Sequence, residues 1–161
     1  MNIYDFAMQM EKDGEQYYRN LIQKTRNAGL KKILDMLADA EVRHYDTLQK
    51  MKKNEKTQLP DSEILSKVKN IFMEMKAGKD TLDVNVSQKE FYKKAQEIER
   101  KSRQFYTEKA AEVDNQSQRE TFLTIADEEE RHYVILENII NFISQPSTWL
   151  ENAEWYHLDE Y

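Results

Sequence analysis

The stretch LADAEVRHY, residues 37–45, decides the fold, because it returns 88 positions later as IADEEERHY, residues 125–133. Each copy places a glutamate and a histidine three residues apart, Glu41 with His44 and Glu129 with His132. Positions i and i+3 lie on one face of a helix, so each pair can reach a single point. Two such pairs that face each other would form a metal site.

The composition favours a single all-α domain over residues 1–161. The chain has 3 Gly, 2 Pro and no Cys. Turn residues are therefore sparse, and disulfides, iron–sulfur clusters and thiolate metal sites are excluded. The net charge of −6 argues against nucleic acid as a partner. The sequence contains neither an apolar run long enough to span a membrane nor a signal peptide, so we expect a cytoplasmic protein.

Hydrophobic periodicity predicts four long helices in two hairpins. The first hairpin occupies residues 1–53, with helices over 2–27 and 30–53, and Gly29 is expected to end the first helix. The second hairpin occupies residues 87–144, with helices over 87–113 and 117–143. Ser-x-x-Glu patterns at Ser87 and Ser117 predict the starts of these two helices, and Pro146 is expected to end the last one.

Two further segments connect and follow the hairpins. Residues 54–86 are too long for a tight turn, and they predict a crossover that includes a short amphipathic helix over 61–76. Residues 145–161 are predicted to form a short helical tail. The tail is expected to dock on the bundle, or to contribute to a homodimer contact, through Trp149, Leu150, Trp155 and Leu158.

The repeat extends through both hairpins at the same offset. Glu11 recurs as Glu99, Tyr18 as Tyr106, and the small residue Gly14 as Ser102. Chance similarity would not keep one offset through both helices and loops. The chain is therefore predicted to be a duplicated helix–turn–helix folded as a four-helix bundle.

Six polar residues occupy positions where the helical periodicity expects core residues: Glu11, Glu41, His44, Glu99, Glu129 and His132. Burial of several unpaired carboxylates is costly, and no Lys or Arg shares these positions. Two divalent cations would balance four carboxylates. Oxygen and imidazole ligands without thiolate suit iron or manganese, and zinc can substitute. The expected roles are bridging for Glu41 and Glu129, and terminal for the other four.

For residues near these six positions, the sequence indicates a role less specifically. Tyr18 and Tyr106 share the helix faces of Glu11 and Glu99, and they either donate hydrogen bonds to carboxylates or pack in the core. Gly14 and Ser102 would leave room for an oxygen species. Residues expected at the surface are Glu128 and Glu130, Arg43 and Arg131 in ion pairs, and the unrepeated Glu154-x-x-His157.

These motifs resemble the rubrerythrin-type family of the ferritin-like superfamily. The resemblance covers Ala7-x-x-x-Glu11-x-x-Gly14-x-x-x-Tyr18, Glu41-x-x-His44 and their second copies. It implies a ferritin-like four-helix bundle with two iron ions that reduces hydrogen peroxide or reacts with dioxygen. Full rubrerythrins carry a rubredoxin domain with Cys-ligated iron. Because this chain has no Cys, electrons are expected from a separate donor protein such as a rubredoxin.

One position departs from the family, and two other functions stay open. Many rubrerythrins have a further metal-binding carboxylate where this chain has Ser102, and that carboxylate is associated with peroxidase activity. The first alternative is an iron-handling protein with ferroxidase or storage activity, which for storage requires a closed cage. The second is a bundle that binds metal for structure or sensing and has no turnover.

Overall fold

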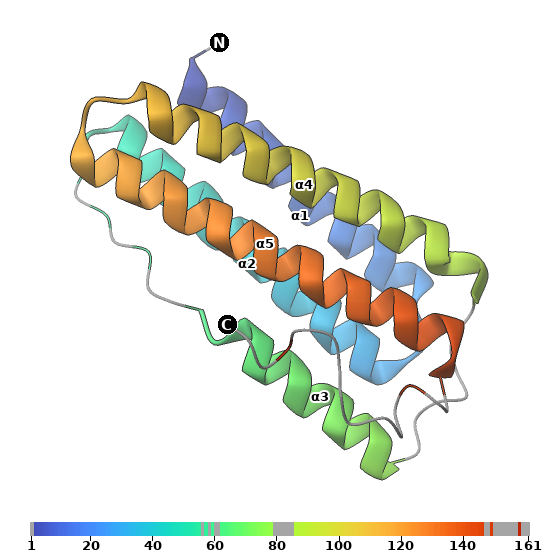
Figure 1. The fold of residues 1–161 in the computed structure, drawn as a ribbon. Coiled ribbons are helices and arrows are strands. Elements are labelled where there is room, and N and C mark those ends of the chain that lie inside the picture. Colours follow the sequence, from blue (N-terminus) through green and yellow to red (C-terminus); the bar gives the residue numbers. More distant parts are fainter. Residues whose placement is uncertain are drawn as a thin grey trace.

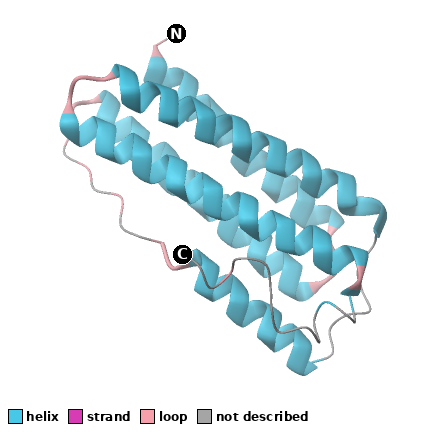
Figure 2. Ribbon diagram, in the orientation of Figure 1, coloured by secondary structure: helices cyan, strands magenta, loops and turns pink. Residues whose placement is uncertain are grey.

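The computed structural model consists of a four-helix bundle with a fifth helix alongside it (Figure 1). The first hairpin is formed by α1 (Ile3–Lys24) and α2 (Ala28–Lys52), and the second by α4 (Lys89–Glu112) and α5 (Gln116–Ser144). The structure describes residues 2–55, 57, 59, 62–78, 86–146, 149 and 158. Within these ranges there is no strand (Figure 2). The predicted all-α fold is confirmed.

The two hairpin loops are three residues long and repeat each other. In the first, the side chain of Asn27 accepts a hydrogen bond from the backbone N–H of Leu30 at 2.9 Å. In the second, Asn115 accepts one from the N–H of Gln118 at 3.0 Å. Asparagine is a favoured residue at this cap position because its side-chain oxygen satisfies a free N–H of the first turn. These two asparagines are 88 positions apart and begin α2 and α5.

Three predicted helix boundaries are wrong. Gly29 lies inside α2, because Asn27 already caps that helix. Ser117 lies inside α5, whose cap is Asn115. The 3₁₀ turn η1 (Val86–Gln88) precedes α4 and places Gln88 rather than Ser87 at the cap position.

The crossover contains α3 (Ile64–Gly78), which packs against α2 and α5 (Figure 1). Its buried stripe includes Val68 and Phe72. The Phe72 ring lies 6.0 Å from the ring of Phe142 and 4.6 Å from that of Trp149. Trp149 and Leu158 of the predicted tail thus pack with this part of the core. The predictions for Leu150, Trp155, Glu154 and His157 fall outside the described residues.

The apolar interior of the bundle is divided into two clusters. One includes Leu21, Leu34, Ala95 and Leu136, and the other includes Ala7, Leu48, Ala110 and Phe122. On each of the four bundle helices, the polar positions predicted from the repeat lie between residues of the two clusters. No helix in the described ranges is both long and apolar enough to cross a membrane.

Candidate metal centre

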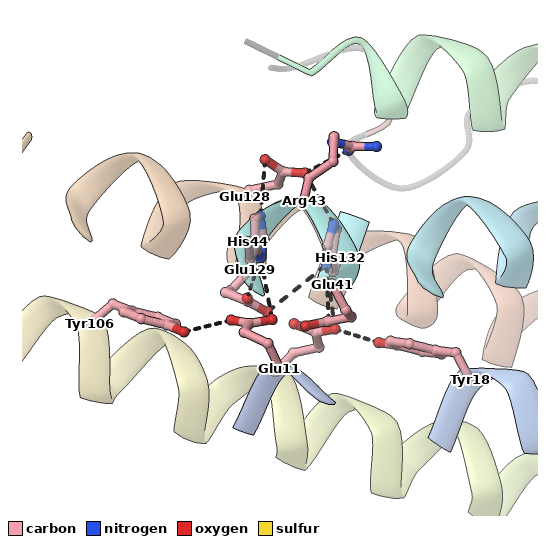
Figure 3. A network of polar contacts seen from close by, with 10 residues as sticks. Glu11, Tyr18, Glu41, Arg43, His44, Tyr106, Glu128, Glu129 and His132 are labelled. Carbon is pink, nitrogen blue, oxygen red and sulfur yellow. Dashed lines mark hydrogen bonds and ion pairs between the residues drawn. The ribbon is translucent and has the colours of Figure 1, made fainter. Parts of the chain in front are cut away.

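All six residues predicted from the repeat come together inside the bundle, and Figure 3 labels all of them but Glu99. Helix α1 provides Glu11 and α4 provides Glu99, whereas α2 and α5 each provide a glutamate and a histidine. Each of the six side chains belongs to a residue that is at most 4% exposed. The helical spacing explains this convergence, because the same face of each helix also carries the core residues on either side.

The six residues form two overlapping groups that could each hold a cation. One group contains Glu11 and His44, the other contains Glu99 and His132, and both include Glu41 and Glu129. In each group the potential ligand atoms lie within 4.8 Å of one another. The two shared glutamates are those for which the sequence predicts bridging positions.

In both histidines, the Nδ1 atom of the imidazole faces the carboxylates. Nδ1 of His44 lies 3.2 Å from an oxygen of Glu129 and 3.4 Å from one of Glu11. Nδ1 of His132 lies 3.4 Å from an oxygen of Glu99. The two rings are nearly parallel, at 14°, with centroids 6.1 Å apart.

Several buried ligand atoms have no hydrogen-bond partner within the described part of the chain. They include both Nδ1 atoms, both carboxylate oxygens of Glu129, and one oxygen each of Glu11 and Glu99. Buried polar atoms in native proteins are normally hydrogen-bonded or bound to a metal. The donor set therefore fits two cations with oxygen and imidazole ligands.

Without cations, protons reduce the charge repulsion in this centre. Burial, together with the negative charges of Glu11 and Glu99, raises the pKa of Glu41 well above its usual range. Burial lowers the pKa of His44, but the Glu11 and Glu128 carboxylates together outweigh burial and raise that pKa to about 10. At His132 the Glu99 and Glu128 carboxylates together likewise outweigh burial and raise the pKa to about 9. The metal-free centre thus holds protons that cations would displace.

Two buried tyrosines each hold a ligand of the opposite hairpin. The hydroxyl of Tyr18 donates a hydrogen bond to Glu99, and that of Tyr106 donates one of 2.6 Å to Glu11. Burial and the adjacent glutamates raise both tyrosine pKa values well above their usual range. Both tyrosines therefore keep the proton that they donate.

Gly14 makes room for a ligand. A Cβ at this position would lie 3.2 Å from the carboxyl carbon of Glu41, closer than ordinary van der Waals contact. The Glu41 carboxylate thus occupies the space beside Gly14 that the sequence predicts for an oxygen species.

Glu128 is a member of the site that the sequence interpretation assigned to solvent, and that prediction is wrong. The residue is 1% exposed. Its two oxygens lie 3.3 Å from Nε2 of His44 and 3.7 Å from Nε2 of His132. Glu128 thus lies behind both imidazoles, on the side opposite the other carboxylates (Figure 3).

Arg43 compensates the charge of Glu128. Its guanidinium lies 3.3 Å from the Glu128 oxygen that also faces His132, and the Arg43 side chain is 48% exposed. Burial raises the pKa of Glu128, but His132 and His44 outweigh burial and hold that pKa well below its usual range. Because Arg43 balances the negative charge of Glu128, the other four carboxylates of the centre are left to balance the charge of two divalent cations. Glu130, the other flanking residue, pairs with Arg103 at 2.9 Å and stays partly exposed, as predicted.

The comparison with protein families agrees with this arrangement. A family model described as Rubrerythrin matches residues 2–140, a range that includes all six residues and both tyrosines. No curated protein and no solved structure matches the chain.

Proposed function

Because the chain belongs to the rubrerythrin family, which implies a di-iron site, we propose that it holds two iron ions in this centre and reduces hydrogen peroxide with electrons from a separate donor protein. The observation that carries the proposal is the pair of buried cation positions sharing Glu41 and Glu129. Two adjacent redox metals could each give one electron to the same small molecule. Manganese or zinc could occupy the same ligands, but zinc would not support redox turnover.

When bound, two ferrous ions would supply the two electrons that, with two protons, convert one hydrogen peroxide into two waters. The chain has no Cys, so it cannot hold the cysteine-ligated iron of a rubredoxin. An external donor such as a rubredoxin would restore the two electrons.

The surrounding residues hold the ligands in place. Tyr18 and Tyr106 donate hydrogen bonds to Glu99 and Glu11 and restrict the rotation of these carboxylates. Glu128 lies against the Nε2 side of both imidazoles, so that each Nδ1 faces the ligand carboxylates. Fixing the ligand orientation in this way lowers the reorganisation needed when a metal binds.

Anaerobic iron loading followed by peroxide titration tests the proposal. We expect two iron ions per chain, oxidation of both by one peroxide, and continued peroxide consumption when a reductant is supplied. Glu41→Ala should abolish iron-dependent consumption because it removes a ligand shared by both cation positions. Asp46→Ala is the matched control, since Asp46 is an exposed residue of the same helix.

Other outcomes would identify the alternatives. Iron oxidation by dioxygen but not by peroxide would make dioxygen the substrate. Iron accumulation far beyond two per chain, in a particle with the mass of a closed cage, would indicate storage. A loaded protein that is inert toward both oxidants would leave a structural or sensing role for the metal.

A further inference from the structure

A small cavity connects the surface with two ligands of the metal centre. It has a volume of about 170 Å³ and lies between α1 and α2. Its outer residues are exposed or partly exposed, whereas its inner residues are buried glutamates of the centre. The lining residues are Glu11, Lys12, Glu15, Glu41, Val42 and Tyr45.

An ion pair lies at the equivalent place on the second hairpin. The repeat relates Glu15 to Arg103 and Val42 to Glu130. On the second hairpin, the guanidinium of Arg103 lies 2.9 Å from Glu130, so an ion pair spans α4 and α5. On the first hairpin Val42 carries no charge, and Glu15 instead contacts Arg19 of its own helix at 3.4 Å. The two hairpins thus share their ligands but differ in what covers them.

The exposure of the bridging glutamates follows this difference. The Glu41 side chain, at the base of the cavity, is 5% exposed, whereas that of its repeat partner Glu129 is 1% exposed. A water molecule occupies about 30 Å³ of liquid. The cavity therefore has room for molecules the size of peroxide or dioxygen, and a protein reductant is excluded by size.

We propose that this cavity is the entrance by which small oxidants reach the metal centre, with Val42 at its mouth, and that the Arg103–Glu130 ion pair closes the equivalent path on the second hairpin. The inference rests on the proposed function in that iron occupies the centre. It adds that oxidant and electrons arrive by different routes, because only the oxidant fits the cavity.

Nitric oxide is a suitable probe, since it is small, uncharged and binds ferrous iron without peroxide turnover. Its association with the diferrous protein can be followed by stopped-flow absorption. Val42→Phe fills the mouth of the cavity, and Glu15→Arg with Val42→Glu copies the ion pair of the second hairpin. Each should slow association by about tenfold or more, because entry would require the helices to move apart, with unchanged iron content and final absorbance.

Arg103→Glu with Glu130→Val is the matched control, because it copies the open face onto the second hairpin. Its association rate should equal or exceed that of the wild type. The proposal is overturned if both closing variants bind nitric oxide at the wild-type rate, or if the control variant is the one that is slowed. Should the charged double variant fail to load iron, Val42→Phe alone decides.

The same measurements separate this inference from the proposed function. Slowed nitric oxide association in the closing variants, together with a wild-type protein that does not consume peroxide, would remove the function and leave the entrance. Peroxide consumption in the wild type, with no slowing in the closing variants, would remove the entrance and leave the function.

Discussion

Tyr18 on α1 donates its hydroxyl hydrogen bond to Glu99 on α4, in the other hairpin. Tyr106 on α4 returns the same contact to Glu11 on α1. Each hairpin thus positions a ligand of its repeat partner, and the two halves of the centre depend on each other.

Removing the Tyr18 hydroxyl should weaken metal binding. In Tyr18→Phe, Glu99 loses a buried donor, and we expect metal affinity to fall by about 10- to 100-fold, the usual cost of losing a hydrogen bond to a ligand. Cobalt titration by visible absorption measures the affinity. Tyr17→Phe is the control, because the Tyr17 hydroxyl bonds to the carbonyl of Phe91 instead. Equal affinities in the two variants would contradict a role for Tyr18.

Glu128→Gln should weaken both cation positions together. Glutamine keeps the shape of Glu128 but loses the charge that faces both imidazoles. We expect both cobalt-binding steps to weaken, by roughly tenfold or more, with altered cobalt absorption bands. Asp127→Asn changes the exposed neighbour and should leave both steps unchanged. Weakening of only one step would show that Glu128 supports a single histidine.

The stability of the metal-free protein should fall as the pH rises. The pKa values of His44 and His132 are about 10 and about 9 in the folded state, above the ordinary 6.5. The folded protein therefore binds more protons than the unfolded chain above pH 6.5. This contribution to stability is complete below 6.5 and is lost as the pH rises toward 9 and 10. The slope is at most about 1.4 kcal/mol per pH unit for each imidazole.

Denaturant unfolding at several pH values measures this dependence. The metal-loaded protein is the control, because cations replace the protons on its ligands, and its free energy of unfolding should stay nearly constant over the same interval. A metal-free protein whose stability rises with pH in this interval would contradict the assignment of protons to the two imidazoles.

Asn115→Ala should lower the free energy of unfolding by about 1 kcal/mol, the usual cost of losing a helix cap. The side-chain oxygen of Asn115 accepts the bond from the N–H of Gln118. Ser117→Ala is the comparison, because Ser117 is the cap that the sequence pattern predicts but lies within α5. Thermal unfolding distinguishes the two. A larger loss of unfolding free energy from Ser117→Ala than from Asn115→Ala would instead support Ser117 as the cap, as the sequence pattern predicts.

The all-α fold and the burial of the six polar residues could be predicted from the sequence, because both follow from repetition. A constant offset through helices and loops identifies residues that occupy equivalent places, and helical spacing identifies the face that they share. Glu11 and Glu99 carry no local motif, and each becomes recognisable only through its repeat partner. The loops were harder to predict. The caps Asn27 and Asn115 also repeat, but Gly29 and the serine pattern at Ser117 were used to place the boundaries beside them.

Glu128 was missed because it breaks the repeat. Its partner in the first hairpin is Ala40, so comparison of the two copies gave it no support. Two signals were nevertheless available. Glu128 lies four residues before His132 and therefore on the same helix face, and an alanine at the equivalent position is typical of a buried site. Ala40 is fully buried. The route to the centre was also beyond the sequence, because it depends on packing between α1 and α2.

The position of the centre between two apolar clusters has a mechanical consequence. Each of the two groups of potential cation ligands joins residues from three helices and from both hairpins, so a loaded centre would act as a cross-link in the middle of a chain that contains no cysteine. A disulfide would make such a link depend on thiol oxidation. A link through the proposed metal centre would instead depend on the supply of metal, which would set how firmly the two hairpins are held together.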